Sequence, residues 1–196
     1  MTRTQHPIEV ESYRILRSKV DTAALPPVTR AVTERVIHTS ADLDYVTDLV
    51  CDEDALRAGQ RALAAGAQLV VDVRMLAAGI TSRQCAVALE LSGVPPEGLT
   101  RSAAGIRAAA AEHSEGAVWA VGNSPTALRE LIRLAADGVV EPALVIGLPV
   151  GFVDAAAAKA ALRDSGLPAL SNRSAKGGAA VAAAAVNALL YWEPVQ

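Results

Sequence analysis

The stretch "AVWAVGNSPTALRELIRLAADG" (residues 117–138) decides the fold, because it passes from a strand pattern to a helix pattern within a few residues. Residues 117–122 are apolar at nearly consecutive positions, which is typical of a strand covered on both faces. Ser124 is then a candidate N-cap, and Pro125 suits the first position of a helix. Free backbone N–H groups at such a helix start face the carboxyl edge of an open sheet, where anions bind. The stretch predicts a strand-to-helix unit with a ligand-binding edge; an ordinary capped helix is the alternative.

The same alternation of strand and helix patterns continues along the chain from residue 68. Short Val- and Ile-rich segments predict strands at residues 68–72, 84–90, 117–122, 143–148 and 168–172. Ala- and Leu-rich segments of helical period follow four of them, at residues 102–113, 125–138, 154–166 and 177–192. This order predicts an α/β fold that is doubly wound, with a mainly parallel sheet of about five strands.

The first part of the chain has a different pattern, with three predicted helices and no strong strand. The helices are expected in "PIEVESYRILRSKV", "PPVTRAVTERVIH" and "DEDALRAGQRALAAG". Asp52 is a plausible N-cap for the third helix, and Gly66 stands where a glycine would end it. We therefore expect one domain over residues 1–196, with a mainly helical N-terminal part (1–66) before the α/β sheet part (67–192).

Composition and missing motifs exclude several classes of function. The chain has 196 residues, a formal net charge of −3 and only 3% aromatic residues, so neither a basic field nor a stacking platform favours nucleic acid. A nucleotide-binding enzyme of the Rossmann type is disfavoured, because no G-x-G-x-x-G follows a first strand and no phosphate-binding loop motif is present.

Nothing in the sequence predicts a membrane segment. The N-terminal "MTRTQHPIEVESYR" has no apolar core of a signal peptide. The longest apolar run, "GGAAVAAAAVNALLYW", consists mostly of alanine and contains Asn187. We expect a protein of the cytoplasm that makes no membrane contact.

His38 is the first candidate for chemistry, because it lies in the last turn of the second predicted helix. Carbonyl groups at a helix C-terminus favour a cation by about 0.3–1 kcal/mol, which suits an imidazole that donates a proton near neutral pH. A surface histidine that only caps the helix is the alternative. Arg35 lies one turn earlier on the same face. An arginine next to a protonated His38 is favourable if an anionic substrate lies between them. The alternative is an exposed Arg35 that pairs with Asp or Glu.

Segments that follow the other strands supply further candidates for binding an anion. They combine a helix start, a glycine that lets backbone approach a ligand, or a cation. The candidates are Asn123, Ser124, Gly151, Lys176, Gly177 and Arg101. For each one an ordinary structural role, such as a cap, a turn or a solvated charge, is the alternative. Asp72 and Arg74 are expected to form a local ion pair at the sheet edge.

Six segments, in order, resemble the precorrin-8X methylmutases of cobalamin biosynthesis. They are "IEVESYRIL", "RVIHTSAD", "DVRMLAAGI", "AVGNSPTAL", "LPVGFVDAAAAKAAL" and "KGGAAVAAAAVNALL", which span the chain from about residue 8 to residue 190. The resemblance implies an isomerase that moves a methyl group from C-11 to C-12 of precorrin-8X and forms hydrogenobyrinate. It implies no metal and no organic cofactor.

The resemblance also implies roles for individual residues. The proton donor of the family falls on His38, and its substrate-binding serine and arginine fall on Ser12 and Arg35. It further implies a homodimer with active sites near the subunit interface. Two alternatives stay open: action on cobalt-precorrin-8 to give cobyrinate, as in the anaerobic pathway, and a corrinoid-binding carrier without turnover.

The sequence departs from the family pattern before the last helix. The family often has Arg-Lys-Gly-Gly or Arg-Leu-Gly-Gly there, whereas this chain has Ala175 before Lys176 and its two glycines. Either a contact to a substrate carboxylate is lost, or Arg173 supplies it from two residues earlier. The Asn-Ala-Pro of the family is Asn123-Ser124-Pro125 here, which only adds a capping hydroxyl.

Overall fold

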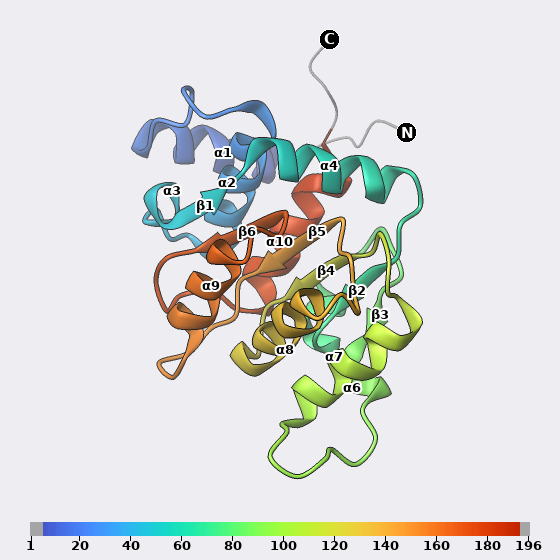
Figure 1. Cartoon of the computed structure of the whole chain (residues 1–196). Helices are drawn as coiled ribbons and strands as arrows, with labels where there is room; N and C mark the ends of the chain where they lie inside the picture. The colour runs from blue at the N-terminus through green and yellow to red at the C-terminus, as the bar shows by residue number, and fades with distance from the viewer. Residues whose placement is uncertain (1–5, 193–196) are drawn as a thin grey trace.

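The computed structural model describes residues 6–192, and a six-stranded sheet forms its centre (Figure 1). The strand order is β1-β6-β5-β4-β2-β3. The strands are β1 (Leu49–Cys51), β2 (Leu69–Val71), β3 (Ala86–Val87), β4 (Val118–Val121), β5 (Leu144–Gly147) and β6 (Ala169–Asn172). Strands β2 to β6 pair in parallel, and β1 pairs antiparallel with β6. The carboxyl ends of β2, β4, β5 and β6 therefore share one edge of the sheet.

Helices cover both faces of this sheet. They are α1 (Pro7–Lys19), α2 (Pro27–Ser40), α3 (Tyr45–Asp48), α4 (Glu53–Ala64), α5 (Arg74–Ala78), α6 (Ala88–Leu91), α7 (Arg101–Glu112), α8 (Pro125–Ala136), α9 (Ala155–Asp164) and α10 (Ala179–Leu190). Helices α7, α8 and α9 lie on one face, and α2, α4 and α10 lie on the other with α1 outside them (Figure 1). None of the helices within residues 6–192 is long and apolar enough to cross a bilayer.

Alternate residues of each central strand face the two helical layers. In β4, Val118 and Ala120 belong to the apolar cluster that includes α2 and α10, whereas Trp119 and Val121 belong to the cluster of α7, α8 and α9. All four residues of β4 are buried. The apolar strands of the sequence are thus explained by burial on both faces.

The doubly wound, mainly parallel architecture is confirmed, as are the strands expected at residues 68–72, 117–122, 143–148 and 168–172. Two predicted helix signals are also confirmed. The Asp52 carboxylate accepts hydrogen bonds from the first turn of α4, and Gly66 follows the end of that helix with a φ of 97°.

The edges of the sheet differ from the expectation. Strand β1 lies in the part that was expected to contain no strand, since three residues are too few to give an alternating pattern. The strand expected at residues 84–90 is wrong beyond Val87, because Ala88–Leu91 forms the short helix α6. Its Ala-Leu-Glu-Leu sequence favours a helix, and β3 has a neighbour on one side only.

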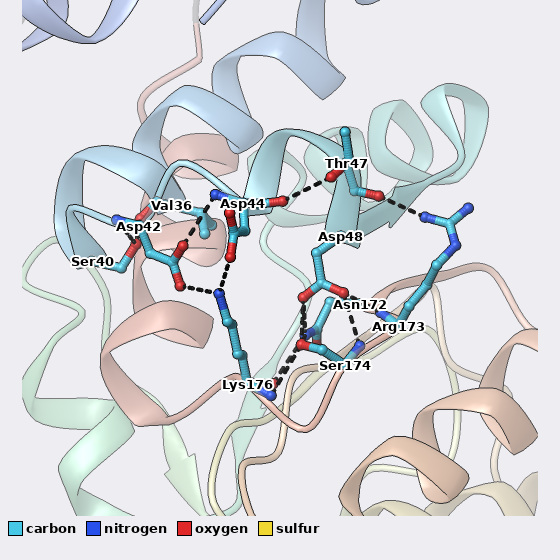
Figure 2. A network of polar contacts seen from close by, with 10 residues as sticks. All are labelled: Val36, Ser40, Asp42, Asp44, Thr47, Asp48, Asn172, Arg173, Ser174 and Lys176. Carbon is cyan, nitrogen blue, oxygen red and sulfur yellow. Dashed lines mark hydrogen bonds and ion pairs between the residues drawn. The ribbon is translucent and has the colours of Figure 1, made fainter. Parts of the chain in front are cut away.

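A buried lysine fixes the segment 173–178 that follows β6. The Lys159 ammonium on α9 is fully buried and donates to Asn172 Oδ1 at 2.8 Å and to the Lys176 carbonyl at 2.6 Å. Asn172 Nδ2 in turn donates to Asp48 Oδ2 at 2.7 Å. Figure 2 shows the Asp48 carboxylate, which also accepts from the backbone N–H and the hydroxyl of Ser174. The segment is therefore held between α9, α3 and the end of the sheet.

The same segment is tied to the turn after α2. Lys176 Nζ donates to Asp42 Oδ2 at 2.7 Å and to Asp44 Oδ2 at 2.6 Å (Figure 2). That turn begins at Ala41, which caps α2 with a left-handed φ of 54°. The contact joins the carboxyl edge of the sheet to the end of the helix that carries His38.

The first prediction concerns the close packing of α7 on α6. A Cβ atom added at Gly105 would lie 2.4 Å from the Ala88 carbonyl oxygen, so Gly105→Ala forces the two backbones apart. We expect it to lower the free energy of unfolding by about 1–3 kcal/mol in chemical denaturation. Gly93→Ala is the control, because nothing lies within 4 Å of its added Cβ. Equal stabilities of the two variants would contradict the packing.

The second prediction concerns the ionisation of Lys159. Burial lowers the pKa of this ammonium from 10.5 to about 8, aided by Arg163 and opposed by Asp48. Between about pH 8 and 10.5 the folded state therefore binds fewer protons than the unfolded state, and stability rises with pH. We expect the unfolding free energy of the native chain, relative to that of Lys159→Met, to increase by about 1–3 kcal/mol across this range. A difference that stays constant with pH would show that Lys159 has an ordinary pKa.

Candidate active site

Helix α1 presents Ser12 to His38 near the end of α2. Helix α2 begins with Pro27 as its first residue and ends where the Ala41 N–H donates to the Ile37 carbonyl, so His38 lies in its last turn as predicted. Ser12 Oγ lies 2.7 Å from His38 Nδ1, and both side chains are partly buried. This hydrogen bond fixes one ring nitrogen of the imidazole and so restrains the orientation of the ring.

Tyr13, which no sequence pattern indicated, lies against the same imidazole. The two ring centroids are 5.1 Å apart, and the ring planes differ by 16°, so the rings are stacked. Burial raises the pKa of Tyr13, and the nearby Arg35 guanidinium offsets part of this effect. The hydroxyl therefore stays protonated at physiological pH.

Arg35 forms an ion pair with Glu9 of α1. Both side chains are largely buried, with exposed fractions of 19% for Arg35 and 9% for Glu9. The expectation that a carboxylate pairs with Arg35 is thus met by the protein itself, although inside the molecule and not on its surface. Glu9 was not identified from the sequence. No local pattern indicates it, because its partner Arg35 lies 26 residues further along the chain.

A second carboxylate joins α1 to α2. Burial disfavours ionisation of Glu34, but hydrogen bonds from Arg17, Thr22 and Arg30 outweigh it and lower its pKa to about 2. Arg17 Nη2 lies 2.7 Å from Glu34 Oε2, and Thr22 Oγ1 lies 2.5 Å from Oε1. The position of Ser12 and Tyr13 over α2 is therefore fixed by two ionic contacts between the helices.

A cavity of about 880 Å³ opens between α1, α2, α4 and α10. Its lining includes Tyr13 and the charged residues Glu9, Arg17, Arg30, Glu34, Arg35 and Arg57. The lining has four arginines and two glutamates, and Arg57 also pairs with Glu53 outside the lining, so the wall keeps an excess of positive charge. The volume lies near the upper end of the range for pockets that bind small organic molecules. Ser12 and His38 are not among its lining residues, so Tyr13, which lines the cavity and stacks on the imidazole, connects the cavity to the histidine.

The helix start at Asn123 and Ser124 is capped as predicted, but the backbone N–H groups of residues 122–124 that precede the helix already bind a carboxylate of the protein. The buried Asp72 carboxylate accepts from the N–H groups of Gly122, Asn123 and Ser124 at 3.2, 2.7 and 3.1 Å. Burial raises the pKa of Asp72, and these three hydrogen bonds oppose the rise. An internal carboxylate thus occupies the predicted anion site, and only the side chains of Asn123 and Ser124 remain as candidates for binding substrate.

The expected ion pair between Asp72 and Arg74 is wrong. Asp72 turns toward the start of α8, whereas Arg74 Nε donates to Glu90 Oε1 at 2.6 Å. Arg74 is the first residue of α5, a helix that the sequence analysis did not predict.

The predicted cradle at Lys176 and Gly177 is also occupied by protein groups. Lys176 is held by Asp42 and Asp44, and these hydrogen bonds raise its pKa. A Cβ at Gly177, whose φ is 150°, would lie 2.3 Å from the Leu148 carbonyl oxygen. Gly177 is therefore required because a side chain at this position does not fit against the loop after β5. This is an ordinary structural role, which was the alternative to anion binding.

Gly151 and Arg101 stay predictions as ligand-binding residues. The Gly151 N–H donates to the Ala175 carbonyl at 3.2 Å, and space is open around its α-carbon. Arg101 is exposed at the start of α7 and lines a second cavity of about 480 Å³ with Arg74 and Glu90. The Arg173 guanidinium donates to the Thr47 carbonyl at 2.9 Å, so it too has a contact within the protein.

The structure thus brings Ser12, Arg35 and His38 together, with Glu9 and Tyr13 added to them. The other predicted site residues lie on segments that follow β4, β5 and β6 or begin α7. The arrangement can hold an imidazole in one orientation beside a cation, which suits proton donation to an anionic ligand.

Comparison with known proteins identifies the family. Residues 7–192 match the family model described as precorrin-8X methylmutase. A precorrin-8X methylmutase of Pseudomonas aeruginosa is 41% identical over 191 residues, with 91% of each chain covered. A cobalt-precorrin-8 methylmutase of Priestia megaterium is 36% identical, covering 93% of this chain and 85% of the relative.

A solved structure agrees with the sequence comparisons. The precorrin-8x methyl mutase of Thermus thermophilus superposes with a TM-score of 0.84 at 34% identity, covering 94% of this chain and 96% of that chain. The family model, the relatives and the fold all lead to the same assignment. The chain belongs to the precorrin-8X methylmutase family, the isomerases of cobalamin biosynthesis.

Proposed function

We propose that this enzyme moves the methyl group from C-11 to C-12 of precorrin-8X to give hydrogenobyrinate, with His38 as the proton donor. The observation that carries the proposal is the 2.7 Å contact between Ser12 Oγ and His38 Nδ1. In the protonated imidazole Nδ1–H donates to this hydroxyl, so the proton for the substrate is the one on Nε2. Protonation of the macrocycle near ring C withdraws electron density from the migrating centre and lowers the barrier. Each tenfold gain in rate requires about 1.4 kcal/mol.

The charges around His38 support a cationic imidazole. Carbonyl groups of the last turn of α2 favour it by about 0.3–1 kcal/mol. Arg35, three residues earlier, would oppose it, but its ion pair with Glu9 reduces that repulsion. A substrate carboxylate that approaches Arg35 adds further negative charge beside the imidazole, so binding and protonation support each other.

A large polycarboxylate fits the chemistry of the cavity between α1 and α10. The excess of positive charge on its wall and its volume of about 880 Å³ support a tetrapyrrole acid as ligand. In this proposal Arg35 and Ser12 hold the substrate next to His38. The side chains of Asn123, Ser124 and Arg101, and the open backbone at Gly151, are further candidates for contacts to its rim.

We also propose a homodimer located in the cytoplasm. Membership of the family supports the dimer, and the segment after β5 exposes Val150, Phe152 and Val153, an apolar group that a second subunit could cover. Sedimentation equilibrium that gives the mass of a single 20.2 kDa chain would contradict the dimer.

The third prediction is that His38→Ala folds and binds substrate but loses turnover. Removal of a general acid costs about 10²–10⁴-fold in kcat, and we expect the KM to change only a few-fold. His113→Ala is the control, because this histidine caps the far helix α7.

Single-turnover absorbance of the native chain distinguishes an enzyme from a carrier. A native chain that binds precorrin-8X and leaves its spectrum unchanged acts as a carrier, and the proposal fails.

The fourth prediction concerns the metal content of the substrate. The relative at 41% identity is named for precorrin-8X, which supports the metal-free substrate, whereas other relatives at 36% and 37% identity are named for cobalt-precorrin-8. We expect kcat/KM to be at least tenfold higher for precorrin-8X than for cobalt-precorrin-8. The reverse preference would assign the enzyme to formation of cobyrinate.

A further inference from the structure

Tyr13 contacts each functional part of the proposed site. Its ring stacks on the His38 imidazole, with 5.1 Å between the centroids. It also lines the cavity between α1, α2, α4 and α10. Arg35 lines the same cavity, and its guanidinium acts on the Tyr13 hydroxyl by opposing the rise in the pKa of Tyr13 that burial causes. One side chain thus connects the imidazole, the cation and the ligand cavity.

The stacking contact with Tyr13 restrains the orientation of the His38 ring. The hydrogen bond between Ser12 Oγ and His38 Nδ1 fixes the direction of Nδ1, and a hydrogen bond by itself permits a ring to tilt about that direction. A nearly parallel ring, at an interplanar angle of 16°, limits this tilt and so fixes the direction in which Nε2 points. Because a proton donor must meet its acceptor within hydrogen-bonding distance, this orientation bears on the chemical step.

The Tyr13 hydroxyl acts on Arg35, whereas the ring acts on His38, so the two parts of the side chain have different effects. Arg35 already pairs with Glu9, and a substrate carboxylate must share or displace that partner. The Tyr13 hydroxyl next to the guanidinium helps to keep Arg35 in place during this exchange. The ring of Tyr13 should accordingly influence turnover, and its hydroxyl should influence substrate binding.

We propose that Tyr13 is a positioning residue, whose ring orients the His38 imidazole for proton donation and whose hydroxyl holds Arg35 for the substrate carboxylate. This inference rests on the proposed function of His38 and Arg35.

The fifth prediction separates the two parts of the side chain. Tyr13→Phe keeps the ring, so kcat should stay within about twofold of the native value while KM rises several-fold. Tyr13→Leu removes the ring as well, so kcat should fall at least tenfold, with a rise in KM similar to that of Tyr13→Phe. Both constants are measured with precorrin-8X at saturating and limiting concentrations. If Tyr13→Leu does not fold, Tyr13→Met, which also lacks a ring, takes its place.

A control variant distinguishes positioning from a general loss of stability. Leu16→Val alters a buried residue of the same helix, with an exposed fraction of 5%, and should lower the melting temperature without lowering kcat. A merely structural role for Tyr13 would make its ring-deficient variant behave like this control. A kcat in Tyr13→Leu equal to the native kcat, or an equal loss of kcat in Tyr13→Phe, would overturn the proposal.

A measurement without substrate keeps this test independent of the proposed reaction. A stacked tyrosine shifts the proton NMR signals of the His38 ring upfield, and His38→Ala identifies those signals among the three histidines. The shift should persist in Tyr13→Phe and disappear in Tyr13→Leu. If the shift behaves in this way but His38→Ala retains full activity, the proposed function fails while the stacking contact stands. If the native enzyme shows no upfield shift, the positioning role itself fails.

Discussion

The ionic contact of α1 with α2 is the interaction on which the proposed site depends. Two ion pairs form this contact: Glu9 of α1 pairs with Arg35 of α2, and Glu34 of α2 pairs with Arg17 of α1. Both carboxylates lie largely within the protein, where an ion pair is screened little by solvent. Removing one partner would leave a buried charge unpaired, which is costly. The contact therefore holds α1 in a defined register, and that register brings the Ser12 hydroxyl and the Tyr13 ring onto His38.

A second feature lies at the carboxyl edge of the sheet. There, groups that could bind an anion or a cation are already bound to charged side chains of the protein itself. Asp72 occupies the N–H groups before α8, and two aspartates after α2 hold Lys176. These internal ions make the edge rigid and keep its loops in fixed positions. In the proposed function, an acidic macrocycle is therefore bound more by the arginines that line the cavity than by helix starts.

The sequence predicted the parts of this structure that depend on local patterns. Strands buried on both faces, the cap at Ser124 and the place of His38 in the last turn of α2 all follow from neighbouring residues. The parts it did not predict depend on contacts between distant segments. No local signal says that Asp72 reaches across 50 residues to Gly122, or that Glu9 meets Arg35 across 26. Strand β1 was missed for the same reason, because three residues become a strand only by pairing with β6.

The central claim is that the His38 imidazole, held at Nδ1 by Ser12, delivers the proton from Nε2 to the macrocycle. A crystal structure of the enzyme with hydrogenobyrinate bound tests it most directly. We expect Nε2 within hydrogen-bonding distance of the ring C side of the product, with a product carboxylate at Arg35 and Ser12 still at Nδ1. A product bound elsewhere on the molecule, with His38 in contact only with protein, would contradict it.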